Sequence, residues 1–504
     1  MPSYQCISTL SVLLLALAPN PCTPFVLTPT PPAATATTID TRRLSATSIA
    51  APEHHIDPPD QPYLSLSSIA EGVQDAITKS VTSLFHLDVT AEELDSSVLA
   101  VKGLATPVLV RAPSIGSFSL VRGFTDESLR SFTATVNKVV TDPNNRFLTG
   151  RAVSILCLEG SEVRVIPGQF DPDKGYSFVE VIDTRDRLPS PSTIDKREYL
   201  QYIDDHIQGL IPEPCAPTIR QMEKKEPLFR VSVVRLPDDY ACIFVGMSHI
   251  LGDIVTYTAL MDQLSSLHDA HKSRPIKWNT PEQATHSISS ETLSQRDKQV
   301  MYGLPFAVGV SKNLWTIPNR EHNYLSLSRA KINAKRKELS SEGDLPLSSN
   351  DIIMAALCGA NRSSDIFAFT KRSTKDLHSK ECQGGNLYVE VPFPREVGSD
   401  PNQFRVLSKK GYYYGQDGAG ELPIAPFFEG RVGRITSCVA PLSVHMQFGG
   451  EASETICQTP PHEFVHMTPF DSAVIFTQDG EHIGVLHNFA EIDTHSGLLQ
   501  EILA

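Results

Sequence analysis

The sequence lacks the short patterns that mark several large classes of protein. It holds no CxxC pair, no GxGxxG motif and no GKS or GKT phosphate loop, which argues against redox pairs, zinc ribbons and nucleotide-binding domains. Basic residues are in deficit, with 44 Lys and Arg against 58 Asp and Glu and a formal net charge of −14. Nucleic-acid proteins usually need a basic surface to neutralise phosphates, so we expect no nucleic-acid partner.

Long hydrophobic runs are also missing. Beyond the N-terminal leader, no stretch approaches the roughly 18–20 apolar residues that span a bilayer, so we expect no transmembrane segment in the body. Hydrophobic residues make up 40% of the 504 residues and charged residues 20%, which is the composition of a folded globular protein. No internal repeat is visible, which argues against a solenoid or a propeller.

Metal-binding patterns are weak. The nine cysteines are scattered, and several, such as Cys157 and Cys242, lie inside apolar runs, where a free thiol behaves as a small hydrophobic group. His462 and His466 are four residues apart, but no third ligand is apparent and Pro460-Pro461 precedes them. We therefore expect neither a disulfide framework nor a metal site.

The N-terminal segment, residues 1–55, reads as a targeting presequence followed by a disordered linker. Residues 10–18 form an apolar run of signal-peptide length, and residues 19–51 are rich in Thr, Ser, Pro and Ala with Asp40 as the one acidic residue. Two interpretations stay open: the two-part plastid presequence of an alga with a secondary plastid, or a secretory signal ahead of a linker to the endomembrane lumen or the exterior. A glycosylation sequon at Asn361 supports secretion only weakly, because it falls at the end of a predicted helix.

The body is predicted to be α/β (α+β) with two halves, an N-terminal lobe over residues 56–300 and a C-terminal lobe over residues 301–504. In the first half, apolar spacing predicts two helices and alternation predicts two hairpins. The expected helices are 126–140 and 256–268, the second amphipathic, and the expected strands are 152–158, 162–166, 229–236 and 241–247.

The second half follows a polar, proline-containing stretch, residues 270–320, which we expect to be an irregular crossover between the lobes. Ser348 and Asp351 predict a capped helix start, and an apolar helix runs on to residue 360. Strands are expected at 387–391, 434–439, 473–477 and 483–488. Helices and strands mix without regular βαβ alternation.

One short motif contains candidate catalytic residues, the HILGD stretch from His249 to Asp253. His249 directly follows a predicted strand, where an imidazole facing a cleft can act as a general base near pH 7. Asp253 begins the next helix and can hold the loop, while Gly252 keeps the loop small where a substrate would pass. The spacing alone favours a structural histidine. Whether His249 is catalytic therefore depends on the sequence around the motif.

Residues 227–267 around this motif resemble the catalytic strand–loop–helix of CoA-dependent acyltransferases, the superfamily of chloramphenicol acetyltransferase, peptide-synthetase condensation domains and BAHD acyltransferases. Three further stretches fall in the order of that family, and the likeness covers most of residues 75–504. They are SLRSFTATVNKVVTDPNNRFLTGRAV, LPLSSNDIIMAALCGANRS and RITSCVAPLSVHMQFGGE. The resemblance implies two chloramphenicol-acetyltransferase-like lobes, each a mixed sheet with flanking helices, and an active site in a channel between them.

The sequence departs from the family pattern at several positions. Ser248 stands where many members have a first histidine, and Ile254 replaces the glycine that usually follows the aspartate. The late signature keeps Phe448 and Gly449, while Cys438 stands for a tryptophan. The chain therefore resembles a divergent member.

By resemblance, the reaction moves an acyl group from acyl-CoA to a hydroxyl, or less favourably an amine, of a pigment, lipid or secondary metabolite. His249 would remove the acceptor's proton as it attacks the thioester directly, and Asp253 would be structural, with Arg395 as its candidate partner. Thr436 could donate to the oxyanion or orient the acceptor. No tightly bound cofactor is implied, and a monomer is expected.

Phe448 and Gly449 would shape the loop beside the solvent channel. Two other readings stay open: a condensation-type enzyme with another thioester donor, and a non-catalytic small-molecule-binding protein on the same scaffold.

Overall fold

The computed structural model describes residues 98–102, 114–157, 160–168, 178–211, 227–265, 275–278, 293–316, 320–340, 345–372, 381–385, 388–415, 418–438, 446–466, 468–495 and 497–504. The presequence predicted for residues 1–55 lies outside these ranges. Within them, no helix combines the length and the apolar character that crossing a membrane requires.

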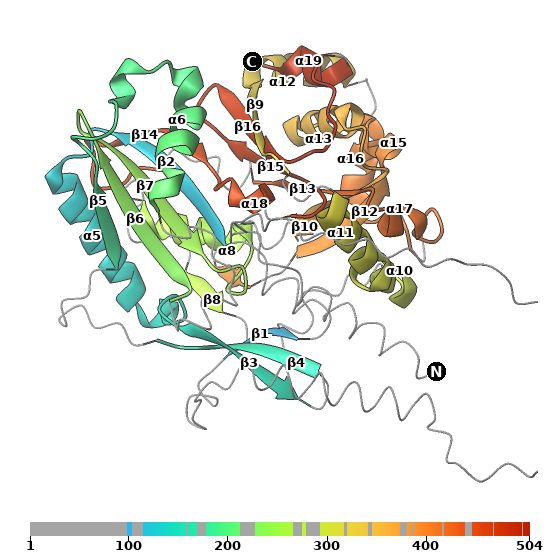
Figure 1. The fold of residues 1–504 in the computed structure, drawn as a ribbon, viewed down its shortest axis with the longest axis horizontal. Helices are drawn as coiled ribbons and strands as arrows, with labels where there is room; N and C mark the ends of the chain where they lie inside the picture. The colour runs from blue at the N-terminus through green and yellow to red at the C-terminus, as the bar shows by residue number, and fades with distance from the viewer. Residues whose placement is uncertain are drawn as a thin grey trace, which may run out of the picture.

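A five-stranded sheet forms the core of the N-terminal half (Figure 1). Its order is β14-β2-β7-β6-β5, antiparallel except for the β5–β6 pair. The strands are β2 (Ile115–Arg122), β5 (Val179–Asp183), β6 (Phe229–Leu236), β7 (Tyr240–Met247) and β14 (Glu454–Thr459). Helices α5 (Asp126–Thr141) and α8 (Ile254–Leu264) pack against each other beside the sheet, and α6 (Tyr199–His206) contacts β14.

The sheet of the C-terminal half has six strands in the order β12-β10-β13-β15-β16-β9 (Figure 1). The central pairs β10–β13 and β13–β15 are parallel, and the outer pairs are antiparallel. The strands are β9 (Asn323–Ser328), β10 (Ile366–Arg372), β12 (Tyr388–Pro394), β13 (Val432–Ser437), β15 (Asp471–Thr477) and β16 (His482–His487).

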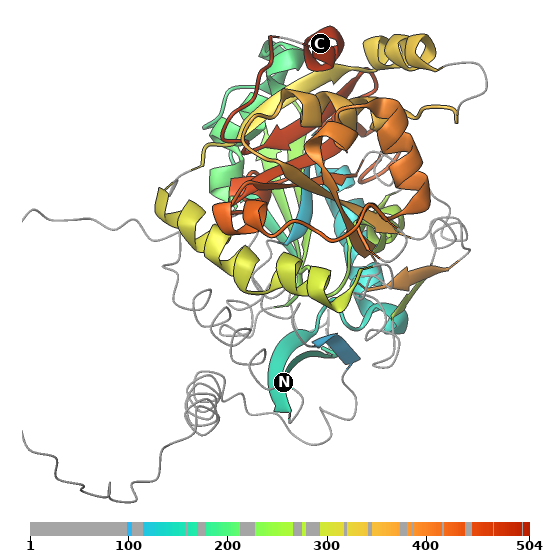
Figure 2. The ribbon, with the colours of Figure 1, turned by 90° about the vertical axis from the view of Figure 1, so that its right-hand side faces the viewer.

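Two groups of helices cover this second sheet (Figure 2). One group packs around α13 (Ser349–Ala360) and contains α12 (Arg329–Leu339), α15 (Arg395–Gly398), α16 (Pro401–Lys410) and α19 (Gly497–Ile502). The other contains α10 (Gln295–Tyr302), α11 (Leu304–Thr316) and α17 (Ala425–Glu429). The helix α18 (Glu463–His466) follows β14.

Two small sheets complete the strands. One has the order β1-β4-β3, and the other is the parallel pair β8–β11. Their bounds are β1 (Val98–Lys102), β3 (Arg151–Cys157), β4 (Gly160–Ile166), β8 (Ile276–Trp278) and β11 (Cys382–Gly384).

The two halves exchange elements. Strand β14 comes from the C-terminal half but pairs with β2 at the edge of the first sheet. Helix α10 spans the boundary that the sequence predicts at residue 300. Its buried Val300 and Met301 belong to a core cluster with Ile366 of the second sheet, so the start of α10, from the first half of the chain, packs with the second lobe. The first lobe is therefore completed by a strand from late in the chain.

Most of the predicted elements are confirmed, because their apolar periodicity is strong. The helix predicted from residue 126 is α5, the two hairpins are β3–β4 and β6–β7, and the capped helix is α13 with Ser348 and Asp351 forming a reciprocal capping box. The four later strands correspond to β12, β13, β15 and β16 with ends shifted by a few residues.

Two expectations are wrong. The helix predicted at 256–268 is α8, which starts at Ile254, and eight of its eleven residues are buried, so it is a core helix and not an amphipathic surface helix. The stretch 270–320 is not irregular throughout, because it contains β8, α10 and α11. Helix α10 gives no apolar pattern because it is polar in sequence and buries only Asp297, Val300 and Met301.

Candidate functional site

His249 lies immediately beyond the end of β7, whose eight residues are all buried. Met247, the last residue of the strand, pairs with Ile115 of β2, and the Ser248 N–H donates to the Leu228 carbonyl at 2.7 Å. Ile250 and Leu251 after the histidine are buried, while His249 itself is half-buried. The backbone on both sides of the imidazole is therefore fixed by the core.

Asp253 caps the helix that follows. Its Oδ1 accepts the backbone N–H groups of Val255 at 3.1 Å and Thr256 at 3.2 Å, which satisfies two of the donors that a helix N-terminus leaves without partners. The residue is 3% exposed. The carboxylate therefore organises the turn between His249 and α8 from inside the protein.

Gly252 allows this turn to close. A Cβ atom at Gly252 would lie 2.6 Å from both Cβ and Oγ1 of Thr256, far inside van der Waals contact. Because the backbone of residue 252 approaches the first turn of α8 so closely, any larger side chain would push the loop away from the helix.

Gly385, in the segment after β11, is a neighbour of the motif that the sequence pattern did not single out. Its carbonyl accepts the Asp253 N–H at 3.3 Å and the Thr256 hydroxyl at 3.3 Å, and its own N–H donates to Thr256 Oγ1 at 3.2 Å. The only signal for it in the sequence is the Gly384-Gly385 pair, because nothing local connects residue 385 to residue 253. A segment from the C-terminal half thus clamps the motif.

Tyr257 ties α8 to the sheet. Its hydroxyl donates to the Val245 carbonyl at 2.9 Å and lies 2.8 Å from Ser117 Oγ, and the side chain is fully buried. Since Val245 is in β7, four residues before His249, this bond fixes the distance between that strand and the helix that Asp253 caps.

Phe448 and Gly449 pack beside α5 and α8. The Phe448 ring is fully buried and meets the Phe132 ring edge-on, with centroids 5.4 Å apart. Gly449 has a φ of +80°, and a Cβ there would lie 2.4 Å from the Ser128 carbonyl oxygen. The preceding residue, Gln447, donates its N–H to Ser265 Oγ at the end of α8 at 3.2 Å. These residues brace the helices of the first lobe.

Arg395 lies in the other half, at the start of α15. Its Nη1 donates to the Asn361 carbonyl at 3.3 Å, and its backbone N–H donates to the Asp365 carbonyl at 2.8 Å. Asp253 caps its own helix, and its pairing with Arg395 stays a prediction.

Thr436 lies in β13 of the second sheet, in register with Val474 of β15, and is partly exposed. Its role at the reacting centre stays a prediction. The sequon residue Asn361 is fully buried and donates its side-chain amide to Asp471 at 2.9 Å, so it is not presented for glycosylation in the folded protein.

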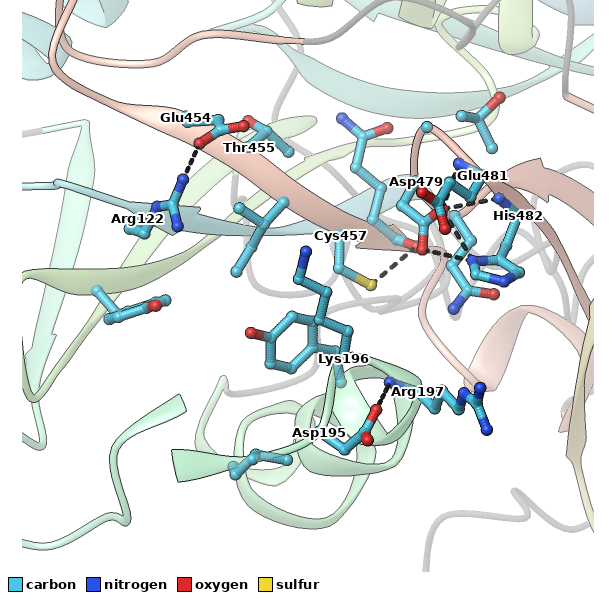
Figure 3. Close-up of a pocket in the computed structure, with 18 of the residues that line it drawn as sticks. Arg122, Asp195, Lys196, Arg197, Glu454, Thr455, Cys457, Asp479, Glu481 and His482 are labelled. Carbon is cyan, nitrogen blue, oxygen red and sulfur yellow. Dashed lines mark hydrogen bonds and ion pairs between the residues drawn. The ribbon is translucent and has the colours of Figure 1, made fainter. Parts of the chain in front are cut away.

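A cavity of about 920 Å³ is lined by residues of both lobes (Figure 3), and His249 is not among its lining residues. Tyr240, one of its lining residues, is seven positions up β7 from Met247, or about 23 Å along an extended strand. Its lining mixes both signs of charge, with Arg122 paired to Glu454 and His482 to Asp479.

The fold was compared with known proteins. No protein-family model matches the sequence, and no curated protein matches it. Among solved structures, F. graminearum TRI101 in complex with coenzyme A and deoxynivalenol is similar, with 10% identity and a TM-score of 0.51 over 78% of this chain and 96% of that one. F. sporotrichioides TRI101 in complex with coenzyme A and T-2 has 9% identity and a TM-score of 0.50, over 79% and 96% of the two chains.

At these identities the likeness concerns the fold, and it extends over almost the whole of the similar chains. It agrees with the two mixed sheets and the flanking helices described above. The chain therefore shares the two-lobed mixed α/β fold of the two TRI101 structures.

Proposed function

We propose that the protein is an acyltransferase that moves an acyl group from acyl-CoA to a hydroxyl of a small-molecule acceptor, with His249 as general base. The observation that carries the proposal is the position of His249 at the end of a buried strand, followed by a turn that Asp253 and Gly385 hold from behind. A base must be held at a fixed place to take a proton in the transition state, and this turn supplies that rigidity.

In this mechanism the imidazole takes the acceptor hydroxyl's proton as the oxygen attacks the thioester carbonyl. The C–O bond forms, the C–S bond breaks, and the proton held on His249 passes to the departing CoA thiolate. The acceptor attacks the thioester directly and no acyl-enzyme forms, so no side-chain nucleophile has to be activated. Thr436 is the candidate donor to the oxyanion, by analogy with the family position it matches.

The departures from the family pattern leave this scheme intact. Ile254 replaces a glycine but occupies the first helical position of α8, behind the Asp253 cap, where a residue with a side chain fits. Gln447 and Glu451 alter the late signature, yet Phe448 and Gly449 still pack against α5. The supporting structure of the site is therefore retained where the sequence has drifted.

The test is turnover with a panel of acyl-CoA donors and alcohol or amine acceptors, comparing His249→Ala and His249→Gln with the unmodified protein. Loss of a general base is expected to lower kcat by about 10²–10⁴-fold with little change in the Tm. His206→Ala is the matched control, because His206 is an exposed histidine at the end of α6 and should keep full activity. Full turnover by both His249 variants would contradict the mechanism.

The same panel separates the alternatives. Turnover with a carrier-protein thioester and none with acyl-CoA would favour the condensation-type enzyme. Binding of CoA or an acceptor by calorimetry without turnover would favour a non-catalytic binding protein. The acceptor class follows from metabolite profiling of a loss-of-function line, which should lose one ester and accumulate its free alcohol.

We also propose that residues 1–55 carry the protein into the secretory route, toward a plastid or an endomembrane lumen. The apolar run at 10–18 and the Thr-, Ser- and Pro-rich segment after it support this proposal. A fluorescent protein fused behind residues 1–55 should leave the cytosol, and a cytosolic signal would contradict both forms of the address.

A further inference from the structure

Three segments that are far apart in the sequence bring two imidazoles and a carboxylate together where the two halves meet. Asp204 is in α6, which contacts β14 of the first sheet. His322 comes just before β9, the edge strand of the second sheet. His462 lies between β14 and α18. The separations from Asp204 are 118 and 258 residues.

The carboxylate lies between the two rings. Asp204 Oδ2 is 2.8 Å from His322 Nε2, and Asp204 Oδ1 is 2.8 Å from His462 Nδ1. The imidazoles are stacked, with centroids 4.5 Å apart and an interplanar angle of 13°. One ligand atom from each residue lies within 4.8 Å of the other two. Two ligands of a tetrahedral zinc ion lie about 3.4 Å apart, and the ion lies in the plane of each ligating imidazole, so the stacked rings have to turn toward each other to bring all three donor atoms to one ion.

The three donor atoms favour one class of metal ion. Two neutral imidazole nitrogens and a carboxylate oxygen are ligands of zinc and other late first-row divalent metals, whereas calcium and magnesium prefer oxygen alone.

Neighbouring groups contact two of the three residues, Asp204 and His462. Gln208 donates from Nε2 to Asp204 Oδ1 at 2.9 Å, and its Oε1 accepts the His462 backbone N–H at 2.8 Å. Glu463 Oε1 lies 3.4 Å from His462 Nε2, so this ring has a carboxylate on the nitrogen that faces away from Asp204. A carboxylate behind a ligating imidazole is a recurrent feature of metal sites, because it sets the ring's tautomer and orientation.

The cluster is open enough to be loaded. The side chains of Asp204, His322 and His462 are 13%, 22% and 25% exposed. Three protein ligands leave the fourth position of a tetrahedral ion for water.

We propose that Asp204, His322 and His462 bind one divalent transition-metal ion, zinc by chemical preference, which cross-links the two lobes. This differs from the sequence expectation of no metal site, since that expectation considered His462 only with His466 and could not connect it to residues 204 and 322. The site goes beyond the proposed acyl transfer and is not required by it.

The test uses the full-length protein after chelator treatment and dialysis. Co²⁺ is titrated with detection of its visible d–d absorption, Zn²⁺ is titrated by calorimetry, and the Tm is measured with and without Zn²⁺. One equivalent should bind and raise the Tm, because a ligand that binds only the folded state stabilises it. Absence of stoichiometric binding to the unmodified protein would overturn the proposal by itself.

His322→Gln and His462→Asn are the informative variants. Each puts an amide N–H near the position of the ring nitrogen that contacts Asp204, so the hydrogen bond can persist while the metal ligand is lost. Each should weaken Co²⁺ and Zn²⁺ binding by about tenfold or more.

His482→Asn is the matched control, because His482 Nδ1 also contacts a carboxylate, that of Asp479, at 3.0 Å and is also 25% exposed. Its metal affinity should equal that of the unmodified protein. Equal affinity in all three variants would place the metal elsewhere and overturn the proposal. Turnover is measured separately, so an inactive protein that still binds metal bears only on the proposed acyl transfer.

Discussion

The Asp253 carboxylate accepts the Thr256 backbone N–H at 3.2 Å and so fixes the start of α8 directly behind His249. This relationship makes Asp253 a positioning residue, whose loss acts on catalysis through the loop. Asp253→Ala should lower the free energy of unfolding by about 1–2 kcal/mol through the lost cap. It should also lower kcat/KM, because the turn that carries His249 loosens. Asp253→Asn keeps an oxygen acceptor and should retain most of both quantities.

The control for this prediction is Asp400→Ala. Asp400 caps α16 in the second lobe in the same way, accepting the N–H groups of Asn402 at 2.8 Å and Gln403 at 3.2 Å. Urea unfolding should show a comparable loss of stability, while kcat/KM stays unchanged. If Asp253→Asn were as inactive as Asp253→Ala, the carboxylate charge itself would matter and the capping role would be insufficient.

The late glycine pair offers a comparison within two adjacent residues. Both glycines have positive φ, +80° at Gly449 and +112° at Gly450, so alanine is strained at either position. Only at Gly449 does the new Cβ meet the Ser128 carbonyl at 2.4 Å, whereas at Gly450 nothing lies within 4 Å. Gly449→Ala should therefore cost about 1–3 kcal/mol more than Gly450→Ala in urea unfolding. Equal costs would mean that the loop moves away from α5 freely.

A buried ion pair supports the second lobe. Arg320 Nη1 lies 2.5 Å from Asp471 Oδ1, and the two residues are 7% and 2% exposed. Asp471 also accepts from Asn361 at 2.9 Å and Ser364 at 2.7 Å. Arg320→Met removes the compensating charge and should cost about 3–5 kcal/mol of unfolding free energy.

Arg329→Met is the control for the ion pair. Arg329 is half-buried and donates to Thr477 at 3.2 Å, without an ion pair among the described residues. Its replacement should cost only about 1 kcal/mol, the value of an ordinary hydrogen bond. Chemical denaturation of both variants measures the difference, and similar costs would show that the Asp471 hydrogen bonds alone support the buried carboxylate.

The sequence predicted the local elements well and the long-range contacts poorly. Apolar runs and a turn predict β6 and β7, and a capping box predicts α13; each of these signals lies within about a dozen residues. The resemblance then located His249 and Asp253. Gly385, which contacts the turn at Asp253, and Asp204, which contacts His462, are each over a hundred residues from the groups they contact. Such contacts depend on how the sheets pack, which no local periodicity encodes.

The family pattern gives Arg395 and Asp253 but not their hydrogen bonds. In the structure Asp253 caps α8, and Arg395 donates to the Asn361 carbonyl. The amphipathic helix expected at 256–268 failed because Thr256 and Thr258 are buried and bond locally, Thr258 to the Ile254 carbonyl at 2.7 Å. A polar residue with a local partner looks like a surface residue in the sequence.

His487 gives the fold a specific pH dependence. Burial of its imidazole lowers its pKa to about 4, although the negative charge of Asp471 opposes the shift. Its Nδ1 accepts the Phe489 N–H at 3.3 Å, which the neutral ring can do and the protonated ring cannot. The unfolded chain has a histidine pKa near 6.5. As the pH falls from about 6.5 toward 4, the unfolded state binds a proton that the folded state excludes, so stability is lost over this window.

The measurement is the free energy of unfolding in urea at pH 7.5 and pH 5.0. His487→Asn retains an oxygen that can accept the Phe489 N–H but cannot titrate, so it should be less stable at both pH values and less sensitive to pH. The unmodified protein should lose about 2 kcal/mol more than the variant between the two pH values. Other histidines, including His462 with its raised pKa, contribute equally to both proteins and cancel in the difference. Equal losses would mean that His487 takes up its proton in the folded state as easily as in the unfolded chain.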